Sequence, residues 1–485
     1  MSFRESSVVV IECGQNVIRA GRGIHNFPLP LPSVEIRACV GLRRDSMQID
    51  GDLSLSSVKA TKYLVGTFFD EAEAAGESLE IFWPFAHDGI REWAQAEALW
   101  RYVLFTSLQL SRSQNEYPVM LCVQPNLPRL SYERLAQIFF ERFNAAALSI
   151  FERPLLQMFA ANSLSGVVVD IGQDITMIGP VLDSDVYRYG LRAVPVGAKQ
   201  CESYLVNVLK NNASLMSQLN TPVPLTEKDL HAALHQIIRV ATKEGLIHIP
   251  ESEGAIITAQ APPEDEGALS NIAAVLVAGK EKAVIEAAGN KKKSAAQEKK
   301  AAASAAEKER QALDLPIAGE RTVTITLGKE RHRLCDPLFN PVLLNQFLPP
   351  ERWLPEGSVG IDEAVRLAVA SVDHPQRTQL WDGIFLTGDM LKVKNLEAAL
   401  SFRLTRFATH DAESQWQAQG QPATVSTLKF PAYFAEFQER SDVLAAFLGA
   451  CIAAKLIFTD STGKNFVSKS DYAEHGPTAI RDIML

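Results

Sequence analysis

Two acidic residues occupy the same position relative to a glycine in segments that lie far apart in the chain: Glu12 in Glu12-Cys13-Gly14, and Asp170 in Asp170-Ile171-Gly172. Each belongs to a run of β-branched residues that is typical of a buried strand. A glycine after such a strand lets backbone amides approach an anion, and the nearby carboxylate can hold a hydrated cation. The spacing predicts phosphate binding at two similar turns, although an apolar strand that ends in a turn is also a common structural pattern.

Both segments are followed by further strand and helix patterns, which predicts a duplicated α/β architecture with a cleft between two lobes. Apolar residues recur at helical spacing over residues 90–110 and 132–143, and we interpret both stretches as helices that pack against the core. The apolar tract from Val443 to Phe458 is shorter than a membrane span and carries Lys455, which favours a core helix. We expect no membrane contact.

A further helix is predicted between Thr226, a suitable N-cap, and Gly245, a helix stop. It carries His231 and His235 one turn apart, a spacing that could ligate zinc. Ala232 stands where the metalloprotease motif requires a glutamate base. The sequence therefore favours a structural role in the helix for both histidines, and no metal site is predicted.

The length of 485 residues, with 47% hydrophobic and 22% charged residues, is sufficient for two or more globular lobes. The formal net charge of -9 argues against a broad basic surface for DNA, so any contact with nucleic acid is expected to be indirect. Six cysteines are scattered without a CxxC pair. This pattern suggests neither a zinc ribbon nor a disulfide scaffold, and it fits a reducing compartment.

The composition changes over residues 251–315, which we interpret as an insertion. Residues 269–276 have the apolar spacing of a short amphipathic helix. Residues 291–310 are nearly all Ala, Lys and Glu, which indicates a frayed solvated helix or a disordered tether. The lysine run at 291–293 is either a nuclear-import signal or a solvated charge run. Strand patterning resumes at Thr322–Leu327.

Tracts in chain order resemble actin: Gly14 to Gly21, Pro84 to Trp100, Glu116 to Leu121, Gln137 to Asn144, Gly328 to Phe339, Val467 to Tyr472, and Gly476-Pro477. They cover nearly the whole chain except the insertion and the region around residues 46–79. The resemblance implies a duplicated α/β fold of the actin, hexokinase and Hsp70 type, with two lobes around a central nucleotide cleft. It implies an outer lobe of residues 1–152 plus 442–485 and an inner lobe of residues 153–441, with the class-specific insertion 251–315 inside the inner lobe.

Four tracts resemble the ninth class of fungal actin-related proteins more than conventional actin: Lys429–Phe434, Phe447–Ala450, Lys455–Thr459 and Ile272–Glu286. Proteins of this class are subunits of the SWI/SNF and RSC chromatin remodellers. They pair with a second actin-related protein on a long helix of the motor subunit. The resemblance thus implies a nuclear structural subunit whose partners are that protein, that helix and other remodeller subunits, with the nucleosome contacted only indirectly.

The resemblance places seven residues in the nucleotide cleft: Glu12, Gly14, Asp170, Gly172, Gly197, Thr387 and Gly388. Glu12 stands where actin has aspartate, and its extra methylene disturbs the strict octahedral geometry of magnesium. Gln173 and Asp174 stand where actin has an acid and a glycine, which hinders close approach to phosphate. The cleft residues are expected to be vestigial and to hold the lobes together without ligand.

Arg153 occupies the place of actin's water-orienting glutamine, and a guanidinium has no acceptor for a proton of water. Asp389 follows Gly388 where actin has glycine, and a carboxylate about 4 Å from the nucleotide would cost about 4 kcal/mol at an effective dielectric constant of about 20. That cost is roughly half of the binding free energy of about 8 kcal/mol that corresponds to a micromolar dissociation constant. We expect no catalytic residue and no cofactor, and any bound ATP would be weak or structural. The alternatives are a slow actin-like ATPase and a cytoskeletal filament component.

Overall fold

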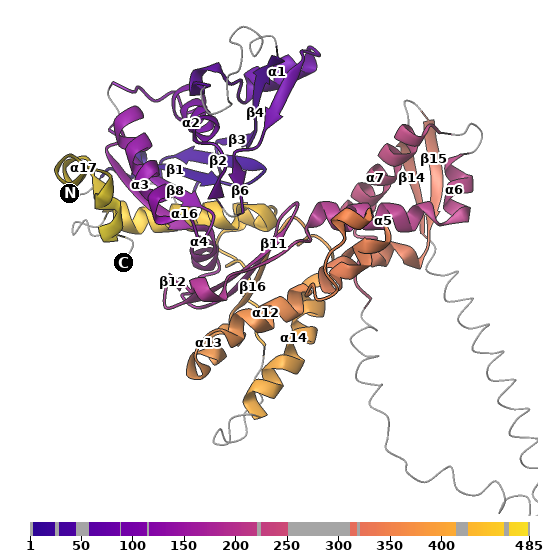
Figure 1. Cartoon of the computed structure of the whole chain (residues 1–485). Helices are drawn as coiled ribbons and strands as arrows, with labels where there is room; N and C mark the ends of the chain where they lie inside the picture. The colour runs from indigo at the N-terminus through magenta and orange to yellow at the C-terminus, as the bar shows by residue number, and fades with distance from the viewer. Residues whose placement is uncertain are drawn as a thin grey trace, which may run out of the picture. The chain divides into compact units, whose positions relative to one another are not determined.

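The computed structural model (Figure 1) describes ten stretches of the chain: residues 3–24, 29–44, 58–87, 89–113, 116–220, 225–250, 311–317, 321–413, 425–459 and 465–483. The chain forms two compact units. The first comprises Met1–Ala193, Glu363–Asp389 and Thr405–Leu485, and the second comprises Val194–Asp362 and Met390–Leu404. Residues 153–193 therefore group with residues 1–152. The predicted lobe boundaries do not coincide with this division, and they stay a prediction.

The first unit contains a six-stranded sheet with the strand order β17-β9-β8-β1-β2-β3. Its central strand β1 pairs antiparallel with β2 and parallel with β8. The strands are β1 (Val9–Cys13), β2 (Val17–Arg22), β3 (Val34–Arg37), β8 (Pro118–Val123), β9 (Ala147–Glu152) and β17 (Val467–Ser468). Every residue of β1 and of β8 is buried. The predicted strand before Gly14 is confirmed, and burial on both faces explains its unbroken apolar run.

A second sheet of the same unit repeats this arrangement. Its central strand β10 pairs antiparallel with β11 and parallel with β16, as β1 does with β2 and β8. The strands are β10 (Gly166–Ile171), β11 (Thr176–Leu182), β12 (Asp185–Val186), β13 (Arg192–Val194) and β16 (Ile384–Gly388). Both hairpins close in the same way: Gly14 N–H donates to the Val17 carbonyl at 3.1 Å, and Gly172 N–H donates to the Ile175 carbonyl at 2.9 Å. The predicted duplication is thus visible at the level of strand pairing.

Two helices join the two sheets into one core. They are α4 (Arg153–Ala160) and α16 (Ser441–Thr459), which pack against each other, and α16 also packs on β1, β8 and β16 (Figure 1). Their apolar cluster includes residues of both sheets. The tract from Val443 to Phe458, predicted to be a core helix, is the body of α16. Within the described stretches, no helix has the combination of length and apolar character needed to cross a membrane.

The outer elements of the first unit cover the other face of the first sheet. The predicted helices over 90–110 and 132–143 are α2 (Trp93–Arg101) and α3 (Arg129–Gln137), each continued by a π-helical segment, η5 (Tyr102–Ser107) and η6 (Ile138–Arg142). Their buried side chains, led by Trp100 and Phe139, form one cluster with β1, β2 and β8.

The other elements of the first unit are η1 (Glu5–Ser7), β4 (Val40–Arg43), η4 (Ala60–Lys62), α1 (Thr67–Ala74), β5 (Leu79–Phe82), β6 (Phe85–Ala86), β7 (Gly89–Ile90), η7 (Arg188–Gly190), α12 (Ile361–Ala370), η11 (His374–Gln376), α13 (Arg377–Trp381), α14 (Leu396–Glu413), α15 (Ala435–Gln438), α17 (Lys469–His475) and η12 (Gly476–Ile483). Helices α12 and α14 each include residues of both units.

The second unit is built from α5 (Ala198–Lys210), α6 (Ala213–Leu219), α7 (Glu227–Lys243), β14 (Gln311–Ile317), β15 (Arg321–Leu327), η8 (Lys329–Cys335), α11 (Asp336–Phe339) and η9 (Pro341–Gln346). The predicted helix boundaries are confirmed at α7: the Thr226 hydroxyl accepts from the Asp229 amide at 3.2 Å, and Gly245 has a φ of +67°. A positive φ of this size favours glycine, because glycine has no Cβ that would clash with the backbone.

The end of the predicted insertion needs a correction. Residues 311–315 were assigned to a partly helical or disordered insertion, but they belong to β14, which pairs antiparallel with β15. Pro316 argues against a central strand, and β14 is one half of a two-stranded sheet, where proline is tolerated. The predicted strand at Thr322–Leu327 is confirmed as β15. The predicted amphipathic helix at 269–276 and the tether at 291–310 lie outside the described residues.

Ser468→Ala is expected to lower the free energy of unfolding by about 1 kcal/mol. The Ser468 hydroxyl accepts from the Asp471 amide at 3.2 Å, and Asp471 Oδ2 accepts from the Ser468 amide at 2.9 Å, so each caps the start of α17. The Ser468 hydroxyl also donates to Asp471 Oδ2 at 2.6 Å, and this hydrogen bond, followed by the one from the Ser468 amide, lowers the pKa of Asp471. Their stabilisation is lost as the pH falls through that lowered pKa. Urea unfolding of both proteins measures the difference at pH 7, and an unchanged midpoint contradicts the prediction.

Candidate functional site

The two acids predicted to mark the phosphate turns are joined by one arginine. Glu12 lies in β1 and is fully buried, Asp170 lies in β10, and Arg153 is the first residue of α4. Arg153 Nη1 donates to Glu12 Oε1 at 2.5 Å, and Arg153 Nε donates to Asp170 Oδ2 at 2.7 Å. We call these three residues the Arg153 clasp. It connects the central strand of one sheet to the central strand of the other.

The clasp continues into a longer row of alternating charges. Arg19 Nη1 donates to Glu12 Oε1 at 3.2 Å, and Arg19 Nε donates to Glu35 Oε1 at 2.9 Å. Arg440 Nη2 then donates to both Glu35 oxygens, at 2.8 and 3.0 Å. We call the row Arg440, Glu35, Arg19, Glu12, Arg153 and Asp170 the charge ladder. It contains three guanidinium and three carboxylate groups, so its formal charges cancel.

The strand register explains why these residues meet. The tight turn after Cys13 sets Glu12 opposite Arg19 in the β1–β2 pair, and the β2–β3 pair sets Arg19 opposite Glu35. Opposite charges at directly paired positions attract each other across a sheet. No sequence pattern predicts a role for Arg19, Glu35 or Arg440 in this site. Counting outward from the Gly14 turn would have paired Glu12 with Arg19.

Burial and pairing shape the electrostatics of the ladder. Burial alone would lower the pKa of Arg153, but the carboxylates of Asp170 and Glu12 outweigh it, and the pKa lies well above the ordinary value. Burial would raise the pKa of Glu35, but hydrogen bonds from Arg440 and Arg19 hold it below the ordinary value. Arg153 and Glu35 therefore stay ionised at neutral pH. Nearby Cys13 has its pKa raised to about 12, chiefly by burial, which makes it a poor nucleophile.

These contacts decide whether the site suits the magnesium that an actin-type cleft implies. Magnesium requires carboxylate oxygens and waters in near-octahedral geometry. Here Glu12 Oε1 accepts from two arginines, and Asp170 Oδ2 accepts from Arg153 and from Gln157 Nε2 at 2.8 Å. The cavity lined by Arg153, Gln157 and Asp170 has a volume of about 10 Å³, and a single water needs roughly 10–15 Å³. The residues present fit a guanidinium and do not fit a hydrated divalent cation.

The predicted cleft glycines have different surroundings. The amides of Gly14 and Gly172 are used inside their own hairpin turns. Gly388 has a φ of +104°, and a Cβ there would lie 2.2 Å from the Ile171 carbonyl oxygen, so only glycine fits. Thr387 is buried and is the register partner of Asp170. Gly197 lies in the second unit, at the N-cap of α5, where its amide donates to Gln200 Oε1 at 2.9 Å.

Asp389 introduces a poorly solvated carboxylate directly after β16. Burial raises its pKa, and Asp170 adds to the shift, while a hydrogen bond from Gln173 opposes it. Its own amide donates to the Ile171 carbonyl at 2.8 Å, which holds the residue against the second hairpin. A negative charge at this position is predicted to oppose nucleotide binding, and the raised pKa indicates that the ionised form of Asp389 is also unfavourable for the protein itself.

Asp389→Asn is therefore expected to stabilise the protein at neutral pH. A carboxyl group whose pKa is raised by folding stabilises the fold when protonated, and this stabilisation is lost as the pH rises through the raised pKa. Asparagine keeps the shape without the charge. Melting temperatures at pH 7 should be higher for the variant than for the wild type, and the difference should shrink towards pH 4. A variant that melts at a lower temperature than the wild type at pH 7 would show that the ionised Asp389 side chain stabilises the fold.

The histidine pair lies where its helix was predicted. His231 and His235 of α7 have ring centroids 4.8 Å apart, and His235 Nδ1 lies 3.6 Å from Glu202 Oε2. Burial, and then the neighbouring His235, lower the pKa of His231. Among the residues that the structure describes, no group of three or more His, Cys, Asp or Glu side chains is placed to hold a metal ion.

Similarity to known proteins supports the same duplicated fold that the strand pairing shows. The family model described as actin matches residues 3–483. The chain is also 22% identical to the SWI/SNF and RSC complexes subunit arp9 of Schizosaccharomyces pombe, over 99% of this chain and 99% of that protein. The match to the family model spans both sheets, both units and the C-terminal elements, and it confirms the predicted duplicated actin-like α/β fold. The chain belongs to the actin family.

Proposed function

We propose that this protein is a non-catalytic structural subunit of a nuclear ATP-dependent chromatin-remodelling complex of the SWI/SNF or RSC type. It binds a partner actin-related protein and a long helix of the motor subunit, and it reaches the nucleosome only through other subunits. The end-to-end similarity to a fission-yeast subunit of these complexes supports the kind of assembly.

The observation that carries the non-catalytic part is the Arg153 clasp. Actin-type hydrolysis needs two acids near a hydrated magnesium and a residue that orients water. Here the side chain at the water-orienting position instead fills the space between the acids and contacts both of them. Glu12 and Asp170 are thus linked through a guanidinium, which supports a fold whose two sheets are joined without a nucleotide.

Single-turnover hydrolysis tests this part. The purified full chain, incubated with radiolabelled ATP and magnesium, is expected to release no phosphate above the rate of buffer alone. An active protein should lose its activity in the Asp170→Asn variant. Phosphate release that disappears in this variant would overturn the non-catalytic assignment in favour of a slow actin-like ATPase.

Co-elution tests the assembly part. The chain, the partner actin-related protein and the helix that precedes the motor's ATPase domain are mixed and passed over a size-exclusion column, and a ternary complex is expected. We expect a helix-in-groove contact along the C-terminal edge. Failure to co-elute in every combination contradicts the assembly role, and pelleting of the chain alone under polymerising conditions would favour a filament component.

Two exposed side chains in the class-like C-terminal tracts allow a sharper version of this test. Tyr433 is 54% exposed and Leu456 is 67% exposed. Exchanging both for serine should weaken co-elution without changing the fold. Leu130, which is 72% exposed on α3, is the matched control, and its exchange for serine should have no effect. If the Leu130 exchange weakens co-elution as much as the exchange of Tyr433 and Leu456, the C-terminal edge is not the contact surface.

A further inference from the structure

A pocket in the first unit, away from the charge ladder, has a strongly basic wall. It has a volume of about 520 Å³, and its charged lining is Lys59, Glu92, Glu97, Arg101, Arg134 and Arg142. We call it the basic pocket. The cations come from separate segments: Lys59 precedes η4, Arg101 ends α2, Arg134 lies near the end of α3, and Arg142 ends η6. The proposed function does not involve this pocket.

The acidic residues of this pocket are already engaged. Glu97 is only 7% exposed and forms an ion pair with Arg142. Glu92 Oε1 accepts from the Ala94 amide at 3.2 Å and caps the start of α2. Each carboxylate therefore has a structural role of its own, and neither forms an ion pair with one of the other cations among the described residues.

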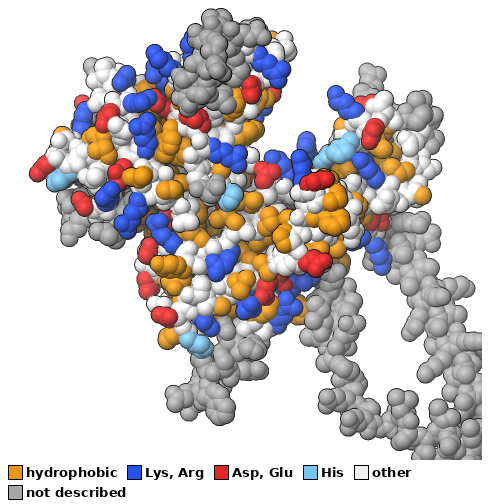
Figure 2. Space-filling model, in the orientation of Figure 1, with side chains coloured by type: hydrophobic (Ala, Val, Ile, Leu, Met, Phe, Trp, Pro, Cys, Tyr) orange, Lys and Arg blue, Asp and Glu red, His pale blue; other side chains and the backbone are white. Residues whose placement is uncertain are grey.

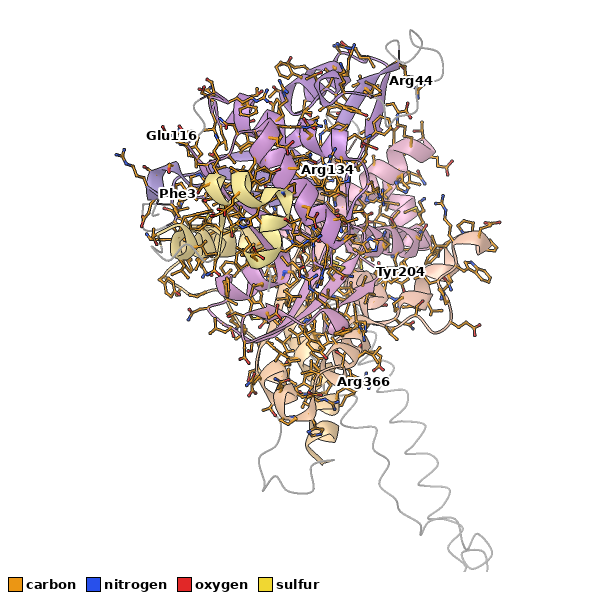
Figure 3. The ribbon with its side chains drawn as sticks, turned by 60° about the vertical axis from the view of Figure 1, so that its left-hand side comes forward. Phe3, Arg44, Glu116, Arg134, Tyr204 and Arg366 are labelled. Carbon is orange, nitrogen blue, oxygen red and sulfur yellow. The ribbon has the colours of Figure 1, made fainter. Side chains whose placement is uncertain are left out.

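Three cations of the pocket are exposed and available. Lys59, Arg101 and Arg134 are all exposed, and none forms an ion pair with a described carboxylate. Arg134 Nη1 donates to the neutral Gln137 side chain at 2.7 Å. Arg134, labelled in Figure 3, projects from α3, and Figure 2 shows Lys and Arg side chains on the face of the molecule that carries α2 and α3. The concentrated positive charge is therefore accessible to a ligand.

We propose that the basic pocket binds a phosphorylated serine or threonine side chain of a protein partner. Cations that converge from separate elements can surround the oxygens of a phosphate monoester, and charge-assisted hydrogen bonds of this kind are the strong ones. Trp93 and Ala94 form an apolar part of the wall that the backbone of a bound peptide can contact. Duplex DNA is a poorer match, because it needs a broad basic surface and this pocket presents a small cluster of cations.

Fluorescence anisotropy of the full chain tests the proposal. The probe is a fluorescein-labelled peptide of alanine and glycine residues around one phosphoserine, and the same peptide with unmodified serine is the comparison. The phosphopeptide should bind and the unmodified one should not. Arg101→Gln and Arg134→Gln should each weaken binding about tenfold, because each removes charged donors worth about 1.5 kcal/mol or more. Binding should also weaken as salt is raised.

Arg129→Gln is the matched control, since Arg129 is an exposed arginine of the same helix α3 that does not line the pocket. Arg142 is left unchanged, because removing it would leave the buried Glu97 without its partner. Equal affinity for the two peptides, or unchanged affinity in the Arg101 and Arg134 variants, would overturn the proposal. So would a DNA duplex that binds more tightly than the phosphopeptide and depends on the same two arginines. These outcomes are independent of ATP hydrolysis and of co-elution with the motor helix.

Discussion

Replacing Arg153 by methionine is expected to lower the free energy of unfolding by about 3 kcal/mol, among the largest effects of any single change in this protein. Removing one partner of a buried ion pair leaves the other charge without compensation, which typically costs about 3–5 kcal/mol. Arg153 compensates two carboxylates, Glu12 with a fully buried side chain and Asp170 with one only 13% exposed. Arg19 remains beside Glu12, so we place the effect at the lower end of that range. Urea unfolding at pH 7 measures it.

Matched variants separate the clasp from a general loss of charge. Arg129→Met, which removes an exposed arginine of the same unit, should change the unfolding free energy by less than about 0.5 kcal/mol. Asp170→Asn in the Arg153→Met background should recover part of the lost stability, because it removes one of the uncompensated carboxylates. If the Arg153 and Arg129 variants unfold at the same urea concentration, the clasp does not stabilise the fold.

Gly449→Ala is the second change with a large expected effect. A Cβ at this position of α16 would lie 1.7 Å from the carbonyl oxygen of Leu156 and 2.4 Å from its carbonyl carbon, in the backbone of α4. Backbone cannot rotate away as a flexible side chain can, so the two helices must separate along a fully buried interface. Overpacking of this kind costs about 3 kcal/mol or more. We expect low soluble yield, and a clearly reduced unfolding midpoint for any soluble protein.

A second glycine provides the control for this substitution. A Cβ at Gly357 would meet no atom within 4 Å, and its φ does not lie in the left-handed region. Gly357→Ala should therefore be neutral or slightly stabilising, because alanine restricts the unfolded chain. If Gly449→Ala is as well tolerated as Gly357→Ala, then the close approach of α4 and α16 does not set the packing of this core.

Local patterns in the sequence were sufficient to predict much of the fold. The strands before Gly14 and Gly172 are continuous apolar runs. Helix α7 has its N-cap residue and its terminating glycine directly at its two ends. These elements can therefore be predicted from neighbouring residues alone. Strand β14 was missed because Pro316 breaks the usual strand signal, and its pairing with β15 depends on a partner strand rather than on local composition.

The site was less predictable because its contacts join residues far apart in the sequence. Arg153 was identified as a departure from actin, but nothing in the sequence shows that its guanidinium reaches both Glu12 and Asp170. Glu35 and Arg440 are separated by 405 residues, and only the folded chain brings them together. Glu12 and Asp170 are in the site as predicted, with a guanidinium between them. The resemblance supplied the positions of the acids, and the structure supplied their partner.

The order in which the chain is synthesised gives the shared core a consequence for folding in the cell. Strand β1 and its neighbour β8 leave the ribosome long before α16, which covers both of them, and before β17, which pairs with β9. The face of the first sheet that α16 covers therefore stays incompletely covered until α16 has been made. Such surface is prone to aggregation, so this protein should depend on chaperones during synthesis more than a chain of similar size whose domains close one after another.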